Sequence, residues 1–176
     1  MSTQTTDREA RREAAMRQIR QIGDPILRTP SIPVQDFDEA LDEEISRMIQ
    51  IMEAADGVGL AAPQVGSLRR LLVARPERDE HVVALCNPVV AWRSDDEEAD
   101  VEGCLSIWEV TAEVPRAVSV RVEAQDPEGN EVEIHAEGFA ARVLQHEIDH
   151  LDGVLILDRA TPESRRAALR ALRESR

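Results

Sequence analysis

Apolar residues in the first third of the chain recur at steps of four and three, which is the spacing of one face of an α-helix. Asp36, followed three residues later by Glu39, is typical of a capping box at a helix start, and Asp56-Gly57 is typical of a helix end. We therefore expect a helix here whose buried face carries Leu41, Ile45, Met48, Met52 and Ala55.

Short runs of aliphatic and β-branched residues predict strands at 71–74, 81–86, 89–92, 110–114, 117–124, 131–136 and 154–157. Residues 126–130 contain Asp, Pro, Gly and Asn, which predicts a turn. Residues 138–151 are typical of a helix, and Thr161-Pro162 is typical of the start of a last one. Because helices and strands do not alternate regularly, we expect an α+β fold, with mixed and antiparallel sheets packed around the helix at 138–151 and a C-terminal helix.

The composition fits one folded domain, which we place at 17–176. The chain of 176 residues is long enough to bury a sizeable core. Residues 1–16 are polar and charged, so we expect a flexible N-terminal extension there. The same stretch lacks the apolar segment of a secretory signal.

Charge and cysteine content narrow the class of protein. A net charge of −14 argues against binding to DNA or to an anionic membrane, and no apolar run approaches the roughly 18 residues of a membrane span. The acidic run at 95–100 is expected to be a solvated loop. Two cysteines without an export signal fit a reducing compartment, so we expect a cytoplasmic protein in which Cys86 packs as a small hydrophobe.

The helix at 138–151 contains the H-E-x-x-H pattern. His146 and His150 are four residues apart, so their imidazoles lie on one face and can bind the same metal ion. Glu147 lies one step round the helix, where its carboxylate can move a proton without being a ligand. Gly153 can end the helix, because glycine accepts the left-handed conformation.

A third ligand is needed, and the pattern alone does not supply it. The position of a third histidine in metzincin proteases is occupied by Ile156, and the other two histidines of the chain lie in predicted strands. Glu163 and Glu174 are the only glutamates after His150, both in a charged terminal segment. Cys104 is the best remaining candidate, because thiolate is a strong ligand for iron or zinc.

Three segments together resemble the peptide deformylase family. They are Gly57-Val58-Gly59-Leu60-Ala61-Ala62-Pro63-Gln64, Glu102-Gly103-Cys104-Leu105-Ser106 and Gln145-His146-Glu147-Ile148-Asp149-His150, and the resemblance extends roughly from residue 17 to residue 159. It implies removal of the formyl group from N-terminal formyl-methionine of newly made peptides, with release of formate.

The resemblance also implies a metal centre. Cys104, His146 and His150 would hold Fe(II), and Zn, Ni or Co could occupy the same ligands. Glu147 would transfer the proton from water to the leaving amine. Glu102 and Asp149 are candidates to orient the imidazoles, although exposed carboxylates are also common.

The same resemblance assigns the substrate contacts. Gln64 and the backbone N–H of Leu105 would stabilise the oxyanion, and Val58, Gly59 and Leu105 would bind substrate. Two positions depart from the family pattern. Trp108 stands where a small or proline residue is frequent, and Thr111 stands near an arginine of some relatives, so the preference beyond methionine stays open.

Alternatives from other classes remain at this point. One is a hydrolase of another formamide or of a peptide bond, and another is a non-catalytic metal-binding or ribosome-associated module. From residue 159 to 176 six Arg face two Glu, a local charge of +4. Arg166, Arg170 and Arg173 would share a helix face that is either simply solvated or, by the resemblance, docks on the ribosome.

Overall fold

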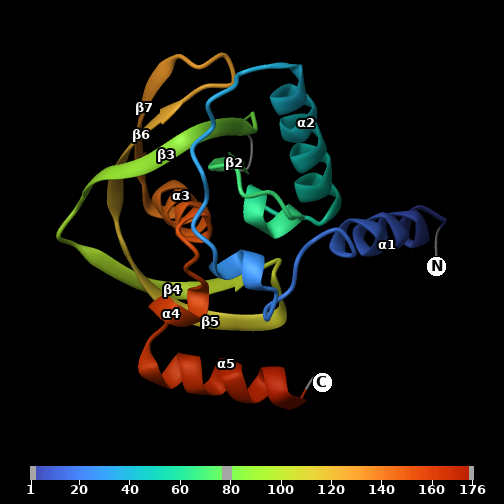
Figure 1. Cartoon of the computed structure of the whole chain (residues 1–176). Coiled ribbons are helices and arrows are strands. Elements are labelled where there is room, and N and C mark those ends of the chain that lie inside the picture. Colours follow the sequence, from blue (N-terminus) through green and yellow to red (C-terminus); the bar gives the residue numbers. More distant parts are fainter. Residues whose placement is uncertain (1–2, 77–80, 175–176) are drawn as a thin grey trace.

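The computed structural model of the chain describes residues 3–76 and 81–174 (Figure 1). The elements in chain order, with η for 3₁₀ turns, are α1 (Thr3–Met16), η1 (Pro25–Arg28), α2 (Glu39–Ala54), β1 (Gly59–Ala61), η2 (Ala62–Val65), β2 (Leu71–Ala74), β3 (Val83–Arg93), β4 (Glu97–Cys104), β5 (Ile107–Ala117), β6 (Ser119–Gln125), β7 (Glu131–Glu137), α3 (Gly138–Leu151), α4 (Ile156–Arg159) and α5 (Pro162–Glu174).

The strands of the described residues form two sheets. One has five strands in the order β1-β2-β3-β6-β7, and the other pairs β4 with β5. These pairings are antiparallel, and an isolated parallel bridge joins Ile32 and Arg69. Helix α3 contacts strands of both sheets, and Figure 1 shows it between the larger sheet and the β4–β5 pair. The predicted α+β fold with antiparallel sheets and a C-terminal helix is confirmed.

Helix α3 is held against the larger sheet by an apolar face at helical spacing. Ala141, Leu144, Ile148 and Leu151 are buried in one core cluster with residues of β2, β3 and β6. Their steps of three and four residues keep them on one side of the helix. The helix ends as expected, with Gly153 in the left-handed region at φ 73°.

Helix α2 confirms the predicted buried face but not its predicted cap. Leu41, Met48 and Met52 are fully buried in a core cluster. The cap is Asp38 and not Asp36: the Asp38 side chain accepts a hydrogen bond from the Leu41 N–H at 3.1 Å. The capping-box prediction was therefore wrong by two residues.

Predictions for two strand regions and one loop need correction. The predicted strands at 81–86 and 89–92 are one strand, β3, which begins at Val83, because Asn87 takes a φ of 54° and makes a bulge instead of a chain reversal. The acidic run is exposed as predicted, but it enters strand β4 at Glu97 instead of forming a loop. Residues 154–157 are not a strand: α4 begins at Ile156 because the Asp158 side chain accepts a hydrogen bond from the Leu155 N–H at 2.8 Å.

The N-terminal segment, which we expect from its composition to be flexible, is helical over the residues that the structure describes. Residues 3–16 form α1, whose end is anchored by Ala15, a buried member of the core cluster of α2. The i,i+4 pair of Arg11 and Asp7, at 2.7 Å, lies on its exposed side. Within the described ranges, no helix has the length and apolar character that crossing a membrane requires.

Candidate metal centre and substrate cleft

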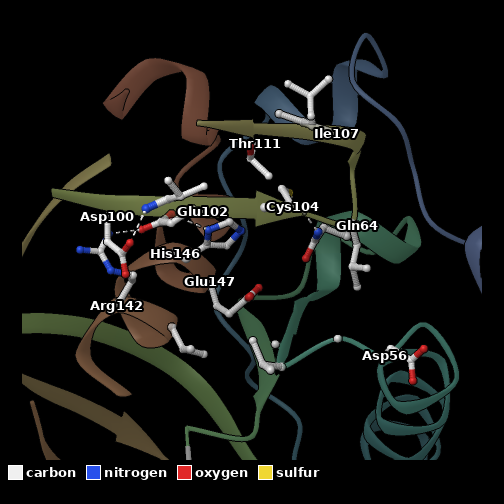
Figure 2. A pocket seen from close by; sticks show the side chains of 18 of the residues that line it. Asp56, Gln64, Asp100, Glu102, Cys104, Ile107, Thr111, Arg142, His146 and Glu147 are labelled. Carbon is white, nitrogen blue, oxygen red and sulfur yellow. Dashed lines mark hydrogen bonds and ion pairs between the residues drawn. The ribbon is translucent and has the colours of Figure 1, made fainter. Parts of the chain in front are cut away.

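A cleft of about 470 Å³ lies between β1, β4, β5 and α3. Its walls are the 56–59 segment with β1, residues 100–105 of β4 and its turn, and the exposed side of α3. Figure 2 shows Glu102 and Cys104 on β4, with His146 and Glu147 facing them from α3 and Gln64 beside Cys104. All eight residues for which a role was expected from the resemblance are in or beside this cleft.

Three of these residues can hold one metal ion. The Sγ of Cys104 lies 3.3 Å from Nε2 of His150, which lies 3.2 Å from Nε2 of His146, and all three ligand atoms are within 4.8 Å of one another. Ligand atoms about 2.0–2.3 Å from a common tetrahedral ion stand roughly 3.3–3.8 Å apart. Cys104, His146 and His150 therefore fit a metal site made of one sulfur and two nitrogens.

His146 is oriented by a buried carboxylate. Glu102 Oε2 lies 3.0 Å from Nδ1 of His146, and Arg116 and Arg142 donate to the same carboxylate at 2.8–3.0 Å. Burial alone would raise the pKa of Glu102, but the hydrogen bonds from His146 and Arg116, with the charge of Arg116, lower that pKa to about 2. The ionised carboxylate fixes the ring with Nε2 towards the other ligands.

Unlike His146, His150 has no carboxylate hydrogen-bonded to its Nδ1 among the described residues. Asp149, a candidate for that role, pairs instead with Arg116 and with Arg159 at 2.9 Å. Nδ1 of His150 is buried and has no hydrogen-bond partner among the described residues. Burial lowers the pKa of His150 well below its ordinary value, which keeps its ring neutral and able to bind a metal ion.

Glu147 is buried on the floor of the cleft. It is 4% exposed, and its Oε2 has no hydrogen-bond partner within the described part of the chain. Burial raises the pKa of Glu147 to about 7. The carboxylate lies against Gly59, where a Cβ atom would stand 2.7 Å from the carboxyl carbon. Only glycine allows this close approach of strand β1 to the acid.

Gln64 is held rigidly by the backbone around it. Its Oε1 accepts a hydrogen bond from the Ala61 N–H at 2.8 Å, which leaves its NH₂ group as the donor on the cleft side. That group reaches Ser106 Oγ at 3.1 Å and Cys104 Sγ at 3.8 Å. The carbonyl of Leu105 accepts from Gln21 at 3.0 Å, which fixes the peptide plane between Leu105 and Ser106.

Arg142 is a cleft residue that was not singled out from the sequence. Arg142 donates to Glu102 and to the Val114 carbonyl at 2.8 Å, and it precedes His146 by four residues. Its position four residues before His146 could have identified it in the sequence, because this spacing places Arg142 on the face of α3 that carries the ligands. Trp108 and Thr111, the two departures from the family pattern, both line the cleft.

Comparisons with known proteins agree with this architecture. The family model described as polypeptide deformylase matches residues 16–166. Peptide deformylase 1 of Corynebacterium glutamicum is 46% identical over 166 residues, covering 92% of this chain and 96% of the relative. The crystal structure of peptide deformylase from Thermus thermophilus has a TM-score of 0.84 at 45% identity, over 89% of this chain and 93% of that one. The crystal structure of peptide deformylase from Thermotoga maritima has a TM-score of 0.79 at 47% identity, and the match covers 82% of this chain and 97% of that one. The chain belongs to the polypeptide deformylase family.

Proposed function

We propose that this chain removes the formyl group from the N-terminal methionine of nascent peptides at the cleft beside Cys104, His146 and His150. The family and its relatives support this reaction, which the sequence also predicted. The observation that carries the assignment of residues is the placement of three ligand atoms within 4.8 Å of one another beside Glu147. This buried carboxyl has one oxygen without a hydrogen-bond partner among the described residues.

The metal would be held by Cys104, His146 and His150. The resemblance favours Fe(II), and the same thiolate and imidazoles suit Zn, Ni or Co. A bound ion would supply Lewis acidity that lowers the pKa of water to the neutral range. Glu102 keeps the His146 ring in the orientation that presents Nε2.

Glu147 moves the proton. Its carboxylate is buried in the cleft, and its Oε2 has no hydrogen-bond partner among the described residues, so it can accept a proton from the attacking water and release it again. The water oxygen bonds to the formyl carbon while the carbonyl π electrons move to the carbonyl oxygen, which gives a tetrahedral oxyanion. The carbon–nitrogen bond then breaks as the C=O bond re-forms. Glu147 then delivers the proton to the departing amine, so that formate and a free N-terminal methionine result.

The oxyanion is stabilised by two donors. The Gln64 NH₂ is already aimed into the cleft because its oxygen is tied to Ala61. The Leu105 N–H follows directly after the Cys104 ligand. Fixed donors of this kind each contribute on the order of 3–4 kcal/mol to the transition state.

The peptide backbone binds along β1. This strand is at the edge of the five-stranded sheet, so one side of its backbone is not paired with β2. Val58, which is 39% exposed, and Gly59 present this edge to the cleft. An extended substrate can add to such an edge by main-chain hydrogen bonds.

A formate-release assay tests the proposal. With formyl-Met-Ala as substrate, Glu147→Gln should lose on the order of 10²–10⁴-fold in kcat while one metal ion per chain is retained. Glu133→Gln, on the exposed strand β7, is the control. Acetyl-Met-Ala should be a poor substrate. Full activity in Glu147→Gln would contradict the role of Glu147, and absent formate release from the native protein would favour a non-catalytic metal-binding module.

Contact with the ribosome is a second part of the proposal. Arg166, Arg170 and Arg173 are exposed on α5, whose buried residue is Ala168. This basic face is suited to ribosomal RNA. Because the proposed substrates are nascent chains, we expect the protein to act in the cytoplasm. Changing the three arginines to glutamate should weaken co-sedimentation with ribosomes without changing turnover of formyl-Met-Ala. Co-sedimentation of the triple variant equal to that of the native chain would contradict the proposed contact with the ribosome.

A further inference from the structure

Helix α1 precedes the family match and lies at the mouth of the cleft. The match begins at residue 16, whereas α1 spans Thr3–Met16. Arg8 pairs with Asp56 at 2.8 Å, and Arg12 lies 3.8 Å from the same carboxylate. The guanidinium of Arg12 also stacks on Trp108, 4.6 Å from the ring centroid. Asp56 and Trp108 both line the substrate cleft, so α1 is attached to two sides of its entrance.

These contacts fix the position of α1 more than they stabilise the fold. The ion pairs are exposed, and exposed pairs contribute little. The helix is anchored at its other end by Ala15 and Ile19, which are buried with α2. Asp56 has a φ of 58° and directly precedes the glycine-valine-glycine segment that forms one cleft wall. Figure 2 shows Asp56 at the end of α2, at the rim of the cleft.

A second groove runs between α1 and Trp108. It has a volume of about 890 Å³, and Trp108 lines both this groove and the substrate cleft. Ala10, Met16 and Trp108 give it an apolar part, while Glu13 and Arg17 give it charges of both signs. An apolar surface with mixed charges suits an extended chain of varied sequence, since it does not select one residue type.

We propose that the groove between α1 and Trp108 binds substrate residues several positions after the formyl-methionine, so that long nascent peptides bind better than dipeptides. This rests on the proposed function of the cleft. A peptide of six residues extends about 20 Å, so it leaves the cleft at its mouth and meets α1 there. Arg12 and Trp108 are the specificity-determining residues, because Trp108 lines both the cleft and the groove, and Arg12, which stacks on it, lines the groove.

The test is the ratio of kcat/KM for formyl-Met-Ala-Ser-Ala-Ala-Ser to that for formyl-Met-Ala. In the native chain the ratio should be about tenfold, mainly through a lower KM. Arg12→Ala should reduce this ratio to about twofold. Asp56→Asn should also reduce the ratio, and asparagine is chosen because it tolerates the positive φ at this position. Arg11→Ala is the matched control, because Arg11 lies on the same helix and pairs only with Asp7 among the contacts described.

The outcomes separate this inference from the proposed function. An unchanged ratio in both Arg12→Ala and Asp56→Asn, or a native ratio near one, would overturn the inference while leaving deformylation intact. Concentration-dependent dimers that disappear in Arg12→Ala would assign the groove to a second copy of the chain and overturn it as well. Absent formate release from both peptides would instead contradict the proposed function.

Discussion

Adding one methyl group at Gly59 should disable Glu147 without removing any catalytic group. The Cβ of alanine at this position would lie 2.7 Å from the carboxyl carbon of Glu147 and 2.8 Å from its Cγ, with Oε1 closer still. Gly59 does not have a positive φ, so alanine fits the backbone itself. The strand is buried and paired with β2 at Ala74, so the carboxylate has to move and not the strand.

The size of the effect follows from that overlap. An ordinary contact would be about 3.4 Å or longer, which requires the Glu147 carboxylate to shift by roughly 1 Å. A shift of this size in a reacting group costs about 100-fold in rate. We therefore expect kcat of Gly59→Ala to fall by about 100-fold, equivalent to about 2.7 kcal/mol in the transition state.

Formate release from formyl-Met-Ala measures this loss, and metal content per chain shows that the ligands remain in place. The matched control is Gly103→Ala, which adds the same methyl beside Cys104 but meets its nearest atom, on Thr111, at 3.9 Å. The control should stay within about threefold of the native rate. If Gly59→Ala also stayed within about threefold, contact between β1 and Glu147 would not limit the reaction and the reasoning would be wrong.

Four further outcomes follow from buried groups. Arg116→Met leaves two buried carboxylates without their shared partner and should cost about 3–5 kcal/mol in urea unfolding, whereas Arg121→Met, at an exposed site, should cost under about 1 kcal/mol. Glu102→Gln removes the charge behind His146 and should weaken metal affinity about 10–100-fold in chelator competition. Burial raises the pKa of Cys86 to about 11, so iodoacetamide at pH 8 should modify it only after unfolding. Since the folded chain holds this thiol proton more tightly, the contribution of Cys86 to stability should be lost as the pH rises from 9 to 11.

The sequence correctly predicted the helices and turns that are determined by residues close together in the chain. The buried face of α2 and the turn between β6 and β7 depend on residue spacing and turn chemistry, and both are present. Elements decided by distant contacts were not predicted. Residues 154–157 have the composition of a strand, but Asp158 caps a helical turn there. Helix α1 packs on the core cluster of α2 through Ala15, and its position is set by contacts with Asp56 and Trp108, which are distant from it in sequence.

In the candidate site, too, features set by local sequence were predicted and features set by distant contacts were not. Helical spacing was enough to bring His146 and His150 together, because both lie on α3. Cys104 was reached by eliminating other ligands and was then supported by the family resemblance, since no local pattern relates a residue of β4 to a helix about forty residues later. The sequence singled out Glu102 as a candidate to orient an imidazole, but it did not relate Glu102 to Arg116 and Arg142, and only the packing of β4, β5 and α3 brings these three residues together.

This buried charge network explains how a cysteine on a two-stranded sheet can be held at ligand distance from a helix. Glu102 lies two residues before Cys104 on β4 and is bound by His146 and Arg142 of α3 and by Arg116 of β5. Apolar residues in these positions would often give a more stable protein, because burying ions has a large desolvation cost. Apolar packing has no direction, however, whereas hydrogen bonds to one carboxylate fix both the separation of β4 from α3 and the rotation of the His146 ring. The network therefore serves to set the geometry of Cys104, His146 and His150, and it does so at the expense of stability.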